Sequence, residues 1–307
     1  MKIRTAIIMF SVVLTCTAIA QPGPTTRPRQ GAMAIPEGTK VLRDVPYVKG
    51  GGKSQSLDLY VPGNATKPMP LVIWIHGGGW QAGDKANNPA VLLLRSGYVV
   101  ASINYRLSQE AIWPTQIYDC KAAVRWLRAH ADEYHIDPDH IGVWGASAGG
   151  HLVALLGTSG DVKEVEGDEG SEKFSSKVQA VCDLFGPADF TKIENDHVAG
   201  DAIVHLFGGP LHDHAKEAKA ASPVTYVTKD DPPFLIMHGT EDPLVQLKQS
   251  RFLDDALKKA GVESHLEVIQ GASHGGPAFA KPQYAMMVFN FFNRHLKNAT
   301  TQPATKP

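Results

Sequence analysis

The sequence predicts an α/β fold, a mainly parallel twisted sheet of about eight strands with helices on both faces. Short apolar runs alternate with amphipathic stretches along most of the 307 residues. The run at 71–75 is continuously apolar, as expected for a strand that is covered on both faces. Functional sites of such sheets lie at the carboxyl ends of the strands. Functional side chains are therefore expected in the segments that directly follow the strands.

The first strands are expected at residues 41–48, 55–61, 71–75, 98–103 and 141–144. The last of them ends just before a glycine-flanked serine. Residues 89–95 predict a helical segment that stops at Gly97. Pro114 suits the first turn of a helix, whose apolar stripe continues to Leu127. Strands that alternate with helices in this way favour parallel pairing.

The second half continues the alternation, with strands expected at 178–185, 234–237 and 266–269. Helices are expected after the serine, at 244–260 and at 282–296. Residues 160–176 are polar and acidic, which predicts a surface excursion, and residues 188–222 predict short helical pieces.

The N-terminus has the pattern of a secretory signal peptide. Lys2 and Arg4 precede a largely apolar stretch at 5–20, which ends in a small-x-small sequence at Ala20. We expect cleavage after Ala20 and a secreted or periplasmic protein, without stable membrane insertion. An uncleaved anchor and a lipoprotein modified at Cys16 are the alternatives.

The remaining chain divides by composition into three parts. Residues 21–36 are rich in Pro, Gly, Thr and Arg and predict a flexible leader. Residues 37–297 form one α/β catalytic domain without an obvious linker, and residues 298–307 form a polar, disordered tail. Cleavage would leave Cys120 and Cys182, which we interpret as buried thiols, with a single disulfide as the alternative.

The charge balance argues against partners that need strong electrostatic attraction. Thirty basic and 31 acidic residues give a formal net charge of −1, and no basic run occurs. Nucleic acid and anionic membrane surfaces are therefore not expected as partners. The sequence leaves the oligomeric state open.

The most informative motif is G-x-S-x-G at 145–149, which lies between an expected strand and an expected helix. A serine is a poor nucleophile unless the backbone exposes it and a base removes its proton. Glycines on both sides permit the sharp strand-to-helix turn that exposes it. Ser147 is therefore the candidate nucleophile, and a structural turn serine is the alternative.

His274 is the candidate base, in a loop of small residues after the last expected strand. The chain also offers His151 and His238, which we interpret as packed or supporting residues. His212 and His214 lack further ligands at a suitable spacing, so no metal site is expected.

Asp242 is the candidate acid, because it follows the strand at 234–237 and precedes His274 in the order serine, acid, histidine. An acid at this position fixes the histidine tautomer and stabilises the imidazolium. Glu241 is the adjacent alternative. Asp242 also suits the start of a helix, since Pro243 follows it.

His76-Gly-Gly-Gly-Trp80 supplies the candidate oxyanion donors. The backbone N–H groups of Gly77 and Gly78, with that of Ala148, are expected to converge on a developing negative charge. We expect Trp80 and Tyr105 to contact the substrate. This set of groups requires no cofactor.

These motifs, together with the stretches at 104–107, 119–127, 137–150 and 185–187, resemble the α/β-hydrolase superfamily over residues 41–296. The resemblance is to its esterase/lipase group with an HGGG-type oxyanion loop. More narrowly, the chain resembles secreted bacterial carbohydrate esterases of the feruloyl and acetyl-xylan type.

The resemblance implies a serine carboxylic ester hydrolase that forms an acyl-enzyme. Its substrates would be short-chain or aromatic acyl esters of plant carbohydrate, either small molecules or polysaccharide-linked. A broad-specificity short-chain esterase or lipase, and an arylformamidase or peptidase-like amide hydrolase on the same triad, are alternatives. A third is a binding protein that uses the fold without catalysis.

Overall fold

The computed structural model describes residues 34–160, 162–193 and 200–297. The chain divides into two units, Met1–Ala32 and Met33–Pro307. The first unit, with the expected signal peptide and most of the leader, lies outside the described residues, as does the expected tail at 298–307. None of the helices in the described ranges is both long enough and apolar enough to cross a membrane.

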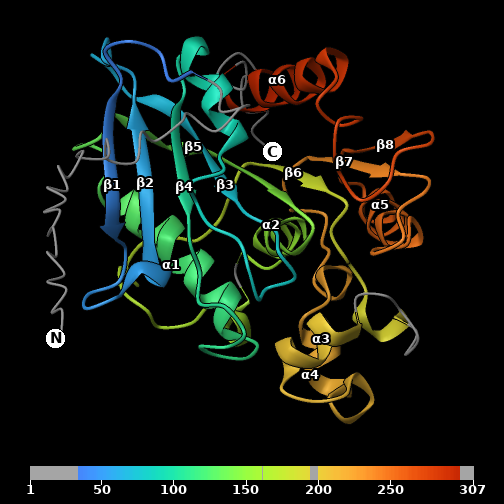
Figure 1. Ribbon diagram of the computed structural model, residues 1–307. Coiled ribbons are helices and arrows are strands. Elements are labelled where there is room, and N and C mark those ends of the chain that lie inside the picture. Colours follow the sequence, from blue (N-terminus) through green and yellow to red (C-terminus); the bar gives the residue numbers. More distant parts are fainter. Residues whose placement is uncertain (1–33, 161, 194–199, 298–307) are drawn as a thin grey trace, which may run out of the picture. The chain divides into compact units, whose positions relative to one another are not determined.

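A single sheet of eight strands organises the second unit, in the order β1-β2-β4-β3-β5-β6-β7-β8 (Figure 1). The strands are β1 (Lys40–Pro46), β2 (Ser56–Val61), β3 (Met69–Ile75), β4 (Val99–Ile103), β5 (Ile136–Ala146), β6 (Ala180–Leu184), β7 (Phe234–Gly239) and β8 (Ser264–Ile269). Among the strands of the described ranges, only the pairs β1–β2 and β2–β4 are antiparallel, and β3 to β8 run parallel. The predicted fold class is confirmed.

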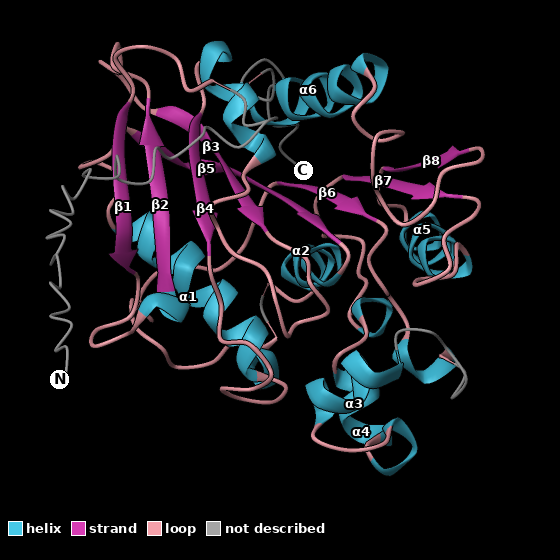
Figure 2. Cartoon of the chain, viewed as in Figure 1, coloured by secondary structure: helices cyan, strands magenta, loops and turns pink. Residues whose placement is uncertain are grey.

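Helices cover both faces of this sheet (Figure 2). The covering helices are α1 (Thr115–Ala129), α2 (Ala148–Thr158), α5 (Lys248–Ala260) and α6 (Pro282–Leu296), while α3 (Gly200–Phe207) and α4 (Ala215–Ala220) lie in the segment between β6 and β7. Buried side chains of α1, α2 and α5 belong to one apolar core, and those of α6 belong to a second. The sheet therefore separates two cores.

Strand β3 shows why the central strands are apolar throughout. Leu71, Ile73 and Ile75 pack into the first core. Val72 and Trp74 point the other way and pack into the second. Because successive side chains of a strand alternate between faces, a strand between two cores needs apolar residues at every position.

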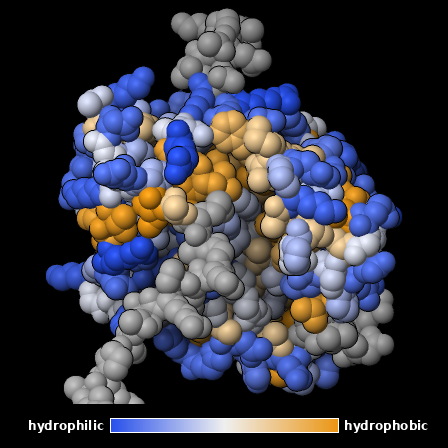
Figure 3. Space-filling model, turned by 45° about the horizontal axis from the view of Figure 1, so that its top comes forward, coloured by the Kyte–Doolittle hydropathy of each residue, from blue (hydrophilic) through white to orange (hydrophobic). Residues whose placement is uncertain are grey.

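The face shown in Figure 3 is mostly hydrophilic, with patches of hydrophobic residues between the hydrophilic ones. Large apolar side chains that are exposed include Ile112, Phe174 and Met286, which lie in different parts of the fold. Cys120 and Cys182 are both buried and free, so the alternative of a disulfide between them is wrong. Burial raises the pKa of both thiols.

Two helix expectations differ from the structure in their bounds. The segment expected at 89–95 is a 3₁₀ helix at Pro89–Ser96, which ends on the left-handed Gly97. The helix expected from 244 begins only at Lys248. The backbone N–H groups of Leu244 and Val245 donate to the Asp242 carboxylate, which holds this segment as a turn.

Helix α6 packs directly onto β5 at Gly142, and we predict that this position tolerates no side chain. A Cβ atom there would lie 2.7 Å from Phe292 and 2.8 Å from Leu296 of α6. Gly142→Ala should lower the free energy of unfolding by about 1–3 kcal/mol, because the buried side chains of Phe292 and Leu296 have to shift. Denaturant unfolding measures the change.

The matched control is Gly52→Ala, where a new Cβ meets nothing within 4 Å. There the free energy of unfolding should stay equal or rise by up to about 1 kcal/mol, since alanine restricts the unfolded chain. Equal stability of the two variants would contradict the close packing of α6 on β5.

Candidate active site

Ser147 lies on a sharp turn between β5 and α2. Strand β5 ends at Ala146 and α2 begins at Ala148, so a single residue reverses the chain direction. The backbone of Ser147 adopts φ 56° and ψ −118°, a conformation that costs a non-glycine residue about 1–3 kcal/mol. Its N–H donates to the carbonyl of Leu184 on β6 at 2.8 Å, which holds the turn in place.

The flanking glycines are required by close approach of the backbone. A Cβ on Gly149 would lie 2.1 Å from the carbonyl oxygen of Ile75, and one on Gly145 would lie 2.3 Å from that of Gly149. No side chain fits at these distances. The G-x-S-x-G spacing thus lets α2 begin directly against the end of β3.

His274 reaches Ser147 from the loop after β8. Its Nε2 lies 2.8 Å from the serine Oγ, and its Nδ1 lies 2.7 Å from Oδ2 of Asp242. A carboxylate only accepts hydrogen bonds, so Nδ1 carries the proton and Nε2 accepts from the serine hydroxyl. The structure therefore brings together the three side chains that sequence analysis proposed for catalysis.

The Asp242 carboxylate has no solvent exposure and is surrounded by donors. Oδ1 accepts from two backbone N–H groups, and Oδ2 faces both His274 and, at 3.2 Å, Nε2 of His238. Burial alone would raise the pKa of Asp242. The hydrogen bonds from His238, His274 and the Val245 N–H outweigh burial, so the pKa lies well below its usual value. Asp242 therefore stays ionised.

The alternative residues have other roles. The His274 ring contacts Asp242, whereas Glu241 is exposed. His151 is fully buried, its Nε2 lies 2.7 Å from the carbonyl of Ala221, and burial lowers its pKa to about 4. Within the described ranges, no group of three or more His, Cys, Asp or Glu side chains could hold a metal ion.

His238 supports the acid, a role that the sequence only suggested. Its ring is buried in β7, with Nε2 2.8 Å from the carbonyl of Val245 and Nδ1 2.7 Å from Oγ of Ser250. The carbonyl of Val245 and the Asp242 carboxylate are acceptors, so Nε2 carries the proton. His238 therefore holds the Asp242 loop against β7.

The glycine loop after β3 lies against the serine turn. A Cβ on Gly77 would be 2.6 Å from the carbonyl oxygen of Ala146, and Gly78 has a φ of 114° that favours glycine. Neither N–H takes part in a turn or loop hydrogen bond among the described residues. Ala148 begins α2, where N–H groups also lack partners within the helix. Three backbone donors thus lie close to Ser147.

A largely apolar cavity of ≈530 Å³ opens at the catalytic side chains. Its walls include Phe185, Ile193, Ile203, Leu244 and Val245. Most of these residues follow β6 and β7 or belong to the helical region after β6. Sequence analysis did not single them out, because nothing local indicates which face of these segments meets the serine.

Of the two residues expected to contact substrate, the structure places only Trp80 at the cavity. Its indole N–H donates to Nδ1 of His151 at 3.1 Å, which fixes the ring. Tyr105 is 1% exposed and is not part of the cavity wall. Its hydroxyl instead donates to the carbonyl of His76 at 3.1 Å.

Asp183 is a buried acid that sequence analysis missed. It lies on β6 with no exposure, Oδ1 accepts from the N–H of Gly186 at 2.9 Å, and Oδ2 has no hydrogen-bond partner among the described residues. Burial raises its pKa to about 6, against the lowering effects of the Gly186 hydrogen bond and of His238. A lone acidic residue in an otherwise apolar strand was the available signal.

Comparison with known sequences supports this assignment of the fold and relates the chain to esterases. The family model described as BD-FAE matches residues 57–257. Esterase LipQ of Mycobacterium tuberculosis is 35% identical over 71% of this chain and 53% of its own length. The probable carboxylic ester hydrolase LipM of the same organism is 33% identical over 68% of this chain and 50% of its own. The chain thus spans about half the length of these curated relatives.

Solved structures agree with the sequence comparison. A truncated form of a carbohydrate esterase from gut microbiota has a TM-score of 0.79 and 35% identity, over 84% of this chain and 98% of its own. A bifunctional GH43-CE protein of Bacteroides eggerthii has a TM-score of 0.77 and 35% identity, over 83% and 38%. Esterase 2 of Thermogutta terrifontis, phosphorylated by paraoxon, has a TM-score of 0.68 and 26% identity, over 84% and 94%.

The eight-stranded sheet, the serine turn and the named relatives define an α/β-hydrolase of the esterase group. Within that group, the chain belongs to the BD-FAE family.

We predict that Asp183 makes the stability of the protein depend on pH. Its pKa rises on folding from 3.8 to about 6, so its contribution to stability is present below about pH 4 and lost as pH rises through about 6. Asp183→Asn removes this titration. Over this pH interval, the free energy of unfolding of the wild type should fall by up to about 3 kcal/mol more than that of the variant.

Denaturant unfolding at several pH values measures the difference. Asp213→Asn is the control, since that side chain is 64% exposed and its replacement should leave the pH dependence unchanged. Parallel curves for the wild type and Asp183→Asn would contradict the prediction.

Proposed function

We propose that this chain is a serine carboxylic ester hydrolase that acts through an acyl-enzyme, with Ser147, His274 and Asp242 as its catalytic residues. The observation that carries the proposal is the continuous hydrogen-bonded series from Ser147 Oγ through His274 to the buried Asp242 carboxylate. Its nucleophile has a strained backbone, is half-buried and lies 2.8 Å from Nε2 of His274. This arrangement is what an activated serine requires.

In the first half of the reaction, Oγ of Ser147 attacks the ester carbonyl while His274 Nε2 takes the hydroxyl proton. The carbonyl oxygen becomes an oxyanion and accepts hydrogen bonds from the N–H groups of Gly77, Gly78 and Ala148. The bond to the alcohol oxygen then breaks. The alcohol leaves with the proton from Nε2, and the acyl group stays on Ser147.

In the second half, water takes the place of the alcohol. Nε2 of His274 removes a proton from water, and the resulting oxygen nucleophile attacks the acyl-enzyme carbonyl. Collapse of the second tetrahedral intermediate breaks the bond to Ser147 Oγ, which regains the proton from Nε2. Asp242 stabilises the imidazolium in both halves, because its lowered pKa keeps it negative. No metal or cofactor takes part in these steps.

The proposed substrate is an acetyl or feruloyl ester of plant carbohydrate. Support comes from two structural neighbours, a carbohydrate esterase from gut microbiota and a bifunctional GH43-CE protein. The cavity of ≈530 Å³ has apolar walls that include Ile193, Ile203 and Val245, which suits an aromatic acyl group. We further propose that the protein is secreted or periplasmic, on the basis of its N-terminal sequence.

A broad-specificity short-chain esterase is the second candidate. The observation in its favour is a structural neighbour, esterase 2 of Thermogutta terrifontis, that was solved with propionate and with butyrate bound. Its 25–26% identity to this chain is lower than that of the carbohydrate esterase. The same triad would serve both functions, so the substrate decides between them.

Replacement of the proposed nucleophile tests the mechanism. Ser147→Ala should lower kcat on a short-chain p-nitrophenyl ester by about 10³-fold or more, because the acyl-enzyme no longer forms. A fluorophosphonate probe should label the wild type and leave the variant unlabelled. Near-normal turnover by the folded variant would refute the proposal, and so would turnover of amides without turnover of esters.

Substrate preference tests the proposed class. We expect methyl ferulate or acetylated xylan to give a higher kcat/KM than p-nitrophenyl esters of long fatty acids. The reason is that the cavity has a volume of only ≈530 Å³ and is lined by side chains from several elements, which limits the chain length that fits. Highest kcat/KM on p-nitrophenyl propionate or butyrate, without activity on the carbohydrate esters, would favour the short-chain esterase.

A further inference from the structure

Behind the glycine loop, two carbonyl groups are each held by a hydrogen bond. The hydroxyl of Tyr105 donates to the carbonyl of His76 at 3.1 Å. The ring Nδ1 of His76 lies 2.7 Å from the carbonyl of Gly77, the next residue. A carbonyl only accepts, so Nδ1 of His76 carries the proton. Burial lowers the pKa of His76, which keeps the ring neutral in this tautomer.

The planar peptide bond connects these carbonyls to the proposed oxyanion donors. In a trans peptide, the C=O of one residue and the N–H of the next point in opposite directions within one rigid plane. The hydrogen bond to the His76 carbonyl therefore sets the direction of the Gly77 N–H. The bond to the Gly77 carbonyl likewise sets the direction of the Gly78 N–H.

The two side chains that hold these carbonyls, His76 and Tyr105, stack on each other. The rings of His76 and Tyr105 lie 4.5 Å apart at an angle of 14°, and both residues are buried, at 5% and 1% exposure. A Cβ on Gly83 would lie 2.3 Å from Nδ1 of His76, so the loop closes directly over the ring. The His76 ring therefore has no room to move toward Gly83 without displacing the loop.

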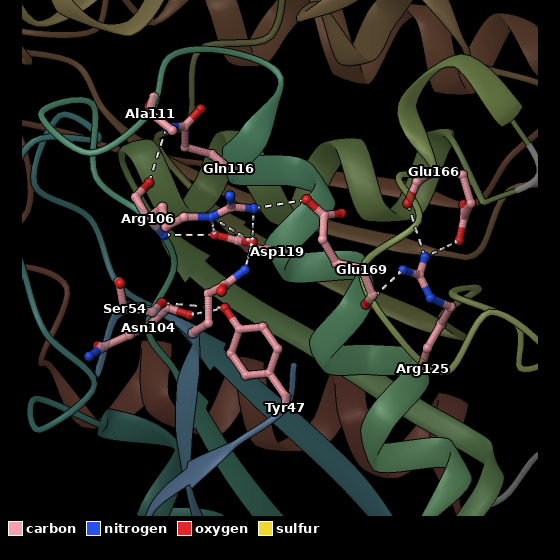
Figure 4. Close-up of polar contacts among 11 residues, drawn as sticks. Tyr47, Ser54, Asn104, Arg106, Ala111, Gln116, Asp119, Arg125, Glu166 and Glu169 are labelled. Carbon is pink, nitrogen blue, oxygen red and sulfur yellow. Dashed lines mark hydrogen bonds and ion pairs between the residues drawn. The ribbon is translucent and has the colours of Figure 1, made fainter. Parts of the chain in front are cut away.

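The neighbours of Tyr105 anchor it to the body of the domain. Arg106 donates to the buried Asp119 carboxylate and to Glu169, as Figure 4 shows. Asn104 accepts from the hydroxyl of Tyr47 through its carbonyl and from the N–H of Lys85 through its side chain. Ion pairs that are partly or wholly buried resist displacement, because breaking one leaves a buried charge without its partner.

We propose that Tyr105 is a positioning residue of the oxyanion hole, which aims the Gly77 N–H through the carbonyl of His76. This inference rests on the proposed function, since it takes Gly77 as an oxyanion donor. It replaces the expectation that Tyr105 contacts the substrate. Asn104 and Arg106 on either side fix the position from which the tyrosine acts.

Tyr105→Phe tests the proposal, because it removes the hydroxyl and keeps the ring stacked on His76. Loss of an oxyanion donor lowers kcat by about 10²- to 10³-fold. Tyr105→Phe keeps the Gly77 N–H and removes only the hydrogen bond that orients it, so kcat should fall by about 10-fold. We expect kcat on a p-nitrophenyl ester to fall by about that factor, with KM unchanged within about 3-fold.

A trifluoromethyl ketone provides a second readout, because its adduct with Ser147 places an oxyanion in the hole. Its inhibition constant should rise in proportion to the fall in kcat of Tyr105→Phe. A merely structural role would not produce this proportion. The matched control is Tyr98→Phe, which also removes a buried hydroxyl with one partner, Asn293 at 2.9 Å, but lies in the second core. Its kcat and inhibition constant should match the wild type.

The outcomes separate the inference from the proposed function. If Ser147→Ala loses activity while Tyr105→Phe behaves like Tyr98→Phe, the inference on Tyr105 is overturned and the proposed function stands. A raised KM with unchanged kcat would instead make Tyr105 a substrate contact, which also overturns it. Full activity of Ser147→Ala would remove the proposed function and the inference together.

Discussion

The close approach of three backbone segments at Ser147 is the constraint on which the site depends. Ser147 needs a positive φ to connect β5 directly to α2. That turn is held only if neighbouring backbone segments of the same chain come close enough for their carbonyl groups to contact it. Gly149 lies against the carbonyl of Ile75, and Gly77 lies against that of Ala146. The turn and the oxyanion loop therefore share one packed interface, so the nucleophile and its proposed donors are placed together.

Charged groups with little or no solvent exposure keep the loops around this interface in place. Asp119 has no exposure and pairs with Arg106, and Lys85 pairs with Asp58 at 2.8 Å next to the oxyanion loop. A buried charge needs an oppositely charged partner within ion-pair distance. This requirement restricts the loops that carry these charges to one arrangement. The ion pairs thus fix the positions of the loops, while the two apolar cores contain most of the buried side chains.

Two carboxylates near the site illustrate how the number of donors sets ionisation. Asp242 is solvent-inaccessible, yet backbone N–H groups and two histidines lower its pKa. Asp183 has one hydrogen-bond donor and one oxygen without a partner, and burial raises its pKa to about 6. The first is suited to stabilise an imidazolium in both steps of the proposed reaction. The second costs stability as the pH rises, since it ionises in a buried position.

The sequence alone determined the features that local pattern encodes. Apolar runs located the central strands, and chain order pointed to Ser147, Asp242 and His274, which the structure brings within hydrogen-bond distance. Only the tertiary structure decided which residues from distant segments meet. It showed that Tyr105 lies behind the oxyanion loop, where its hydroxyl binds the carbonyl of His76, and not at the substrate. It also showed that Asp183 is buried. The physical reason is that strand periodicity and turn chemistry are local, whereas a hydrogen bond between residues 76 and 105 depends on how β3 and β4 pair in the sheet.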